Sequence, residues 1–131
     1  MQLLLRKIAY DSTGVPEYVD SEMARDEIVI GSSPHSDIQL LDSGVGDEHA
    51  RFSNRGEQLR LVAEKGQSFV YNGKTRKQAN LQPGDEIQIG AQTFTCSAPP
   101  AGFDFSLEWQ YAEISGNALA NAYRTSPDQL S

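Results

Sequence analysis

The sequence contains few of the residues that catalysis, disulfide bonding and metal binding use. Its 131 residues include one cysteine and two histidines, so Cys96 has no partner for an internal disulfide. His35 and His49 have carboxylates near them in sequence, but no recognised metal-ligand spacing joins these residues. The Gly-x-Ser-x-Gly pattern of a nucleophile elbow is also missing. We therefore expect no enzymatic activity, no metal and no cofactor.

Long apolar runs and an excess of positive charge are missing too. The N-terminus, MQLLLRKIAY, has three leucines before Arg6 and Lys7, which is too short for a signal peptide, and no run approaches the roughly 20 residues that span a bilayer. These features predict a cytoplasmic protein without direct membrane insertion. The net charge of −7 argues against a nucleic-acid partner, because such a protein needs a basic face.

What the sequence does contain, from residue 2 to about 97, is a series of short apolar segments separated by turn residues. The spacing near ten residues, without a long amphipathic helix, predicts an all-β fold: an antiparallel β-sandwich of about 11 short strands. Residues 11–26 are polar and carry a glycine and a proline, so we expect a loop there, with at most a short strand at Tyr18–Val19. Asn72–Gly73 predicts a two-residue type I′ hairpin, since both residues tolerate positive φ.

The composition changes after residue 98, so we divide the chain into a β-sandwich over 1–98 and a C-terminal tail or linker over 99–131. Apolar residues alternate with polar ones between Phe103 and Tyr111, which favours a half-buried strand. The same residues also form i, i+4 pairs, so a helix within 103–123 remains an alternative. The last residues have no apolar period and are expected to be disordered, and the chain could belong to a longer parent protein.

Several of these signals occur in an order that resembles the forkhead-associated (FHA) domain family over residues 3 to 97. Gly31 follows an Ile–Val–Ile strand, Asp37 begins a second apolar segment, and His49 follows a short turn. The Asn72–Gly73 hairpin comes next, and the pattern closes with the Gly-Asp turn and strand of LQPGDEIQIG. The resemblance implies an eleven-stranded sandwich whose loops at one end bind phosphothreonine peptides. It implies structural support of those loops by Gly31, Asp37, His49, Asn72 and Gly73.

In that family, phosphate recognition uses an arginine directly after the strand-ending glycine, a serine three residues before the histidine, and an asparagine in a later loop. This sequence has Ser32, Gly46 and Gln67 at those places. None of them supplies the bidentate charge of a guanidinium, and Asp47 brings negative charge to the expected phosphate site. The candidate ligand-binding residues of the loops are Ser32, Ser33, His35, Gly46, Asp47, Lys65, Gln67 and Ser68.

The sequence therefore favours a protein–protein interaction module, in signalling or scaffolding, that keeps the FHA fold and binds a protein or peptide independently of phosphorylation. The first alternative is a divergent phosphothreonine-peptide reader that uses Ser32, Ser33, Lys65, Gln67 and Ser68. The second is an assembly module that forms a homo-oligomer through the aromatic stripe of residues 103–111.

Overall fold

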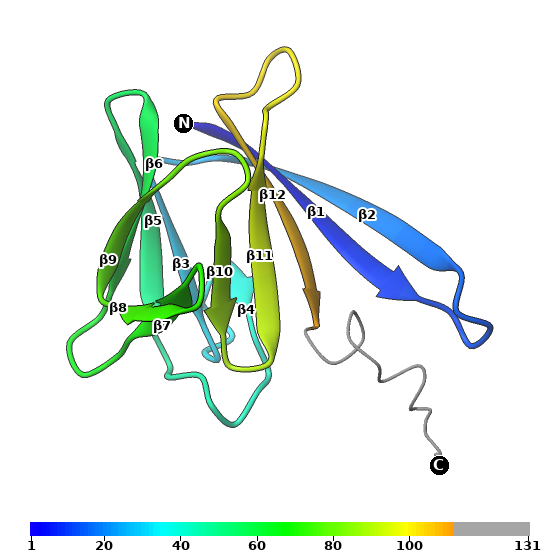
Figure 1. Cartoon of the computed structure of the whole chain (residues 1–131), viewed down its shortest axis with the longest axis horizontal. Coiled ribbons are helices and arrows are strands. Elements are labelled where there is room, and N and C mark those ends of the chain that lie inside the picture. Colours follow the sequence, from blue (N-terminus) through cyan, green and yellow to red (C-terminus); the bar gives the residue numbers. More distant parts are fainter. Residues whose placement is uncertain (112–131) are drawn as a thin grey trace.

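The computed structural model describes residues 1–111, in which two β-sheets pack face to face and no helix occurs (Figure 1). The seven-stranded sheet has the order β2-β1-β12-β11-β10-β7-β8 and the five-stranded sheet the order β4-β3-β5-β6-β9. The strands are β1 (Gln2–Tyr10), β2 (Pro16–Ala24), β3 (Glu27–Gly31), β4 (Ile38–Gln39), β5 (Ala50–Arg55), β6 (Gln58–Ala63), β7 (Phe69–Tyr71), β8 (Lys74–Arg76), β9 (Gln78–Leu81), β10 (Glu86–Ile89), β11 (Gln92–Ser97) and β12 (Phe105–Tyr111).

The predicted all-β sandwich is confirmed, with two differences of detail. The described residues form twelve strands rather than about 11. Two pairings, β1 with β12 and β3 with β4, are parallel, so both sheets are mixed rather than purely antiparallel. Each parallel pair needs a long connection or a polar loop between its strands, because a tight turn can join antiparallel strands only.

The core lies between the two sheets and follows the alternation of apolar residues along each strand. Leu3 and Leu5 of β1, like Ile28 and Ile30 of β3, point inward and are buried. Phe52 and Phe94 meet edge to face across the sheets, with ring centroids 6.3 Å apart. Cys96 is buried in the same core. Burial, with a smaller contribution from the charge of Asp85, raises the pKa of the Cys96 thiol to about 11, so this cysteine is a packing residue rather than a nucleophile.

The segment after the predicted domain boundary contributes a strand to the sandwich. β12 lies between β1 and β11, parallel to the first and antiparallel to the second, which agrees with the strand interpretation and not with the helical one for these residues. The division at residue 98 was drawn at a change in composition, yet Phe105 and Leu107 are buried in the core. Residues 99–104 therefore connect two strands of one sheet. The remainder of the alternative helix, residues 112–123, and the end that is expected to be disordered lie outside the described residues.

Trp109 fixes the position of β12 against its neighbours. Its ring stacks on Phe94, with centroids 5.7 Å apart and planes inclined by 18°, and its indole N–H donates to Oε1 of Gln92 at 2.7 Å. The ammonium group of Lys7 lies 4.9 Å from the ring centroid. The tryptophan thus contacts both neighbouring strands of β12, and these contacts combine apolar packing with satisfied polar groups.

The prediction of a loop over residues 11–26 is wrong. β2 is nine residues long and pairs with β1 along its whole length, forming an arm that extends beyond the two sheets (Figure 1). The sequence of β2 did not indicate a strand, because an edge strand outside the sandwich buries neither face and its side chains therefore show no apolar alternation. Pro16 is compatible with this position because it is the first residue of an edge strand.

The Asn72–Gly73 hairpin is confirmed in its backbone conformation. Both residues have positive φ, 48° for Asn72 and 86° for Gly73, as a type I′ turn requires. The Asn72 side chain accepts a hydrogen bond from the Glu86 N–H at 2.8 Å and donates to Asp85 at 3.1 Å. The chain then crosses from β8 in one sheet to β9 in the other.

Candidate functional site

Three loops and a turn meet at one end of the sandwich, at the bottom of Figure 1. They connect β3 to β4, β4 to β5, β6 to β7, and β10 to β11. We call this the loop end. All eight candidate ligand-binding residues of the sequence lie in the first three of these loops. Asn72 and Gly73, by contrast, belong to the β7–β8 hairpin, and the Asn72 side chain bonds to the segment that leads into β10.

The β3–β4 and β4–β5 loops are joined mainly through their backbones. The Ser32 N–H donates to the Gly46 carbonyl at 2.9 Å, and the Ser33 N–H donates to the Asp47 carbonyl at 3.2 Å. The Ser36 hydroxyl also donates to the Asp47 carbonyl, at 3.3 Å. A Cβ added at Gly31 would overlap that carbonyl and lie 2.7 Å from the Asp47 carbonyl carbon. Glycine is needed here for close approach of two backbones.

The hydroxyl of Ser32 is directed within the protein. It lies 3.4 Å from Oδ1 of Asp47, and because an ionised carboxylate only accepts, Ser32 is the donor. The hydroxyl of Ser33 accepts from the His35 N–H at 3.1 Å, which closes the local turn. Ser32, the residue predicted to stand in place of the family's arginine, thus directs its hydroxyl at a carboxylate of the protein.

The buried His49 side chain connects the β4–β5 loop to the β6–β7 loop from the interior of the domain. It is 4% exposed, and its Nδ1 accepts from the Gly46 N–H at 3.1 Å. Since that nitrogen accepts, Nε2 carries the hydrogen and donates it to the Ser68 carbonyl at 2.7 Å. The His49 backbone also bonds to Ile30 and Glu64. These contacts support the structural role that the resemblance implied for this histidine.

Replacing His49 by alanine should lower the free energy of unfolding by about 2–4 kcal/mol, because the partly buried Gly46 N–H and Ser68 carbonyl would lose their partner and a cavity would form in place of the buried ring. His35→Ala is the matched control. His35 is exposed, and we expect its loss to change stability by less than about 0.5 kcal/mol. Urea denaturation of the three proteins measures both values. Equal stability of the two variants would contradict the bracing role of His49.

Gln67 occupies the space beside Gly46, the residue predicted to stand in place of the FHA family's serine. Its side chain lies against Gly46, and a Cβ added at Gly46 would come within 2.5 Å of Nε2 of Gln67 and 3.0 Å of its Cδ. The Gln67 N–H donates to the Glu64 carbonyl at 2.9 Å, so the loop that carries it is ordered by its own backbone. A serine at position 46 would therefore require the end of the Gln67 side chain to move.

Asp42 anchors the loop end in a way that the sequence did not reveal. Its Oδ2 accepts from the Ala91 N–H at 2.6 Å and its Oδ1 from the Gly44 N–H at 3.3 Å. These two backbone donors, Ala91 first, lower the pKa of the Asp42 carboxyl. Asp42 was not among the candidate residues of the sequence, because Ala91 is 49 residues away and only the fold brings them together.

Asp37 contacts the strand that precedes its loop, as the predicted fastening role would require. Its carboxylate accepts from the Val29 N–H at 2.8 Å and pairs with the Arg25 guanidinium at 3.2 Å. This contact holds the end of the β3–β4 loop against the edge of β3. An aspartate accepts backbone N–H groups well in such a turn because it offers two acceptor oxygens on a short side chain.

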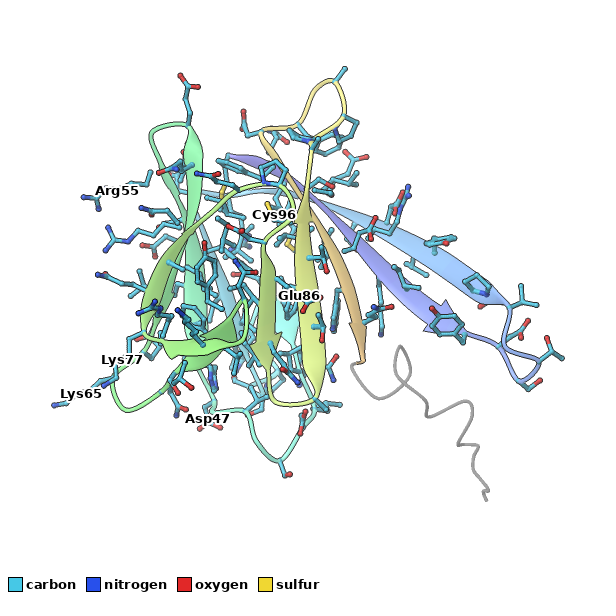
Figure 2. The ribbon with its side chains drawn as sticks, viewed as in Figure 1. Asp47, Arg55, Lys65, Lys77, Glu86 and Cys96 are labelled. Carbon is cyan, nitrogen blue, oxygen red and sulfur yellow. The ribbon has the colours of Figure 1, made fainter. Side chains whose placement is uncertain are left out.

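Negative charge predominates at the loop end. Asp47 lies at its lower rim, whereas Lys65 points outward from the β6–β7 loop on another side (Figure 2). The nearby Arg51 is already bonded to three carboxylates, those of Glu27, Glu48 and Glu64. This guanidinium is therefore neutralised within the protein, and an added dianion would approach more carboxylates than free cations.

The loop end has a shallow, polar hollow beside the β6–β7 loop. Its walls come from the β4–β5 and β6–β7 loops, from the β7–β8 hairpin and from β10 and its turn: Gly44, His49, Gly66, Gln67, Ser68, Phe69, Val70, Thr75, Gln88 and Gly90. Such a surface offers hydrogen bonds to an extended peptide and little apolar area. Within residues 1–111, no group of three or more His, Cys, Asp or Glu side chains is arranged to hold a metal ion.

The packed sheets and the joined loops define an FHA-type β-sandwich, and solved FHA domains superimpose on it. One FHA domain with phosphothreonine-dependent interactions matches with a TM-score of 0.59 and 18% identity, over 76% of this chain and 99% of that one. The FHA domain of the CT664 protein from Chlamydia trachomatis matches with a TM-score of 0.59 and 15% identity, over 76% and 100%. The Slr1951 protein from Synechocystis sp. matches with a TM-score of 0.51 and 26% identity, over 85% and 97%.

The chain belongs to the family described as the cytoplasmic domain of the inner-membrane component of the type III secretion system, whose sequence model matches residues 17–99. That match begins in β2 and ends after β11, so β1 and β12 lie outside it. No curated protein matches the sequence. In residues 1–111 there is no helix long and apolar enough to cross a membrane.

Proposed function

We propose that this chain is a protein-interaction domain that recognises its partner without phosphothreonine, in the cytoplasmic part of a type III secretion inner-membrane component. The observation that carries the proposal is the contact between Gln67 and Gly46, which places a neutral amide beside the residue predicted to replace the phosphate-binding serine. The Ser32 hydroxyl supports it, since it is directed at the Asp47 carboxylate. The interaction surface would be the loop end, whose remaining donors and acceptors suit a peptide backbone.

The alternative of a divergent phosphothreonine reader has one favourable feature, the exposed cation of Lys65 with Ser68 near it in the same loop. A single lysine is a point charge without the planar fork of an arginine. It also points away from the rim that carries Asp47 (Figure 2). Assembly through the aromatic stripe of residues 103–111 has less support, because Phe105 and Leu107 are buried in their own domain.

The test is an NMR titration of the isotope-labelled chain with matched peptides that carry threonine or phosphothreonine. We expect the two series to produce the same shifts of the loop-end amides, or none. Saturable binding that disappears on dephosphorylation would overturn the proposal. In that event Lys65→Ala should weaken binding, whereas Lys77→Ala, a lysine in the β8–β9 connection, should not.

A further inference from the structure

The strand β9 has an open edge. It is the last strand of the five-stranded sheet and, among the described residues, pairs with β6 alone; it lies at the outer flank of the molecule (Figure 1). The Ala63 N–H donates to the Lys77 carbonyl at 2.8 Å, and in an antiparallel ladder such bonded pairs recur at every second residue. By this alternation Ala79 bonds to β6, whereas the backbone N–H and carbonyl groups of Gln78 and Asn80 face away from it, toward the open edge.

The outer face of the sheet carries positive charge beside this edge. Arg60 of β6 lies opposite Asn80, and its guanidinium donates to Oε1 of Gln78 at 2.6 Å. Arg55, at the end of β5, lines the same polar hollow as these three residues and Ala79. Neither arginine forms an ion pair within residues 1–111. Both guanidinium groups can therefore meet a carboxylate of another molecule.

A second hollow adjoins the start of β9, where the chain passes from one sheet to the other. Half-buried apolar or aromatic side chains and exposed polar ones line it: Val62, Ala63, Tyr71 and Ala79, with Arg76, Lys77 and Gln78. Side chains alternate between the two faces of a strand. A strand added to β9 would thus place every second side chain on the face of Gln78 and Asn80, beside the arginines, and the others on the more apolar face of Ala79.

The other edge strands of the described sheets offer less to an added strand. β4 and β8 are two and three residues long, and β2 has nine residues without a basic side chain. β9 combines an open edge with cations and with hollows that adjoin it. Figure 2 shows Arg55 and Lys77 pointing outward on this flank. The partner that complements this edge is extended and acidic.

The charge of the whole chain favours a peptide segment over a lipid surface as that partner. The chain has 18 acidic and 11 basic residues, and an anionic leaflet acts on every charge within a Debye length, about 10 Å at 0.1 M salt. Most of the carboxylates would therefore oppose its approach. An extended segment contacts only the residues next to β9, where the nearest charges are those of the arginines.

We propose that β9 accepts an extended segment of a partner protein as an added strand, in which carboxylates alternate with apolar side chains. The segment's backbone bonds to Gln78 and Asn80, its carboxylates face Arg55 and Arg60, and its apolar side chains lie on the face of Ala79. Main-chain hydrogen bonds provide the affinity of such an added strand, and alternate side chains provide its specificity. The two hollows share no lining residue with the hollow at the loop end, so this inference and the proposed function can fail independently.

The test uses a synthetic peptide of alternating glutamate and valine, about six residues long like a typical strand, and the isotope-labelled full chain. In an NMR titration to about 1 mM peptide, we expect saturable shifts of the Gln78 and Asn80 amides and roughly tenfold slower hydrogen exchange of both. A peptide with lysine in place of glutamate should not bind. Arg55→Gln/Arg60→Gln should weaken binding about 3–10-fold, as expected for two exposed charge pairs, whereas Lys65→Gln, at the loop end, should leave it unchanged.

Changes to the backbone separate strand addition from attraction between charges alone. Asn80→Pro removes an N–H that faces the open edge, which an edge strand tolerates, and should abolish binding; Asn80→Ala keeps the N–H and should bind normally. In the peptide, alternate N–H groups point to opposite edges, so N-methylation of either the glutamates or the valines, but not of both sets alike, should abolish binding.

Four results would overturn the proposal. They are the absence of peptide binding, equal binding of the two N-methylated peptides, and peptide shifts confined to the loop end. The fourth is occupation of the edge by something else: phosphatidylglycerol vesicles that bind through Arg55 and Arg60 while the peptide does not, or a second copy, seen as self-association that Asn80→Pro removes.

Discussion

A chain that ends at residue 98 should fail to fold. β12 separates β1 from β11, and its registered partners run from Leu3 to Lys7 on one side and from Gln92 to Ser97 on the other. Without it, the β1–β2 arm has no strand to join, and Phe94 loses the ring of Trp109. The truncation removes a strand from the middle of a sheet. The free energy of unfolding should therefore fall by nearly the whole stability of such a domain, about 5–15 kcal/mol. Amide dispersion in a two-dimensional NMR spectrum measures the outcome.

Point variants in the same strand show whether packing explains the effect. Leu107 is fully buried, so Leu107→Ala should lower the free energy of unfolding by about 2–5 kcal/mol. The next residue, Glu108, points to the other face, and Glu108→Ala should change it by less than about 0.5 kcal/mol. A truncated chain that keeps a dispersed spectrum would show that residues 1–98 fold alone, as the change in composition suggested.

Among substitutions that add a single methyl group at the loop end, Gly31→Ala should lower the stability of the fold most. The new methyl group would overlap the Asp47 carbonyl and approach Cα of Glu48 to 3.0 Å, and all of these atoms are backbone that cannot rotate away. The hydrogen bonds from Ser32 and Ser33 to the β4–β5 loop would break as the loops separate. We expect a loss of about 3 kcal/mol or more from overpacking and broken hydrogen bonds together, measured by chemical denaturation.

Gly44→Ala is the matched control for this substitution. Gly44 lies in the adjoining loop, and a Cβ there would meet only the Cα of Gly90, at an ordinary 3.6 Å. The free energy of unfolding of the Gly44→Ala variant should stay within about 1 kcal/mol of that of the unchanged chain. If the two alanine variants are equally stable, the close approach of the two backbones at Gly31 does not exist in solution.

The residues that build the fold were visible in the sequence because their requirements are local. Asn72–Gly73 specifies a turn by its own φ preferences, and alternating isoleucines in β3 and β10 specify buried faces. β2 was missed because an edge strand buries little, and the parallel pairing of β12 with β1 depends on contacts between the two ends of the described chain. Local patterns carry no signal for such pairings.

The candidate site likewise combines features that are visible in the sequence with features that depend on the fold. Gly46 and Gln67 were each recognised as departures from the FHA pattern, one by one. That the second side chain occupies the space beside the first is a fact of three dimensions, as is the bond from Asp42 to Ala91. The sequence presents these positions as separate departures, whereas the structure places the Gln67 amide in the space that a side chain at position 46 would occupy.

The stacked position of Trp109 makes the last described strand visible to fluorescence. It is the single tryptophan of the chain, and its ring contacts β11 through Phe94 and β1 through Lys7. Its emission therefore reports whether β12 is seated between its two neighbours, separately from the strand content that circular dichroism averages over both sheets. Unfolding followed by both signals would reveal whether the sheet opens first at this seam or loses all of its strands together.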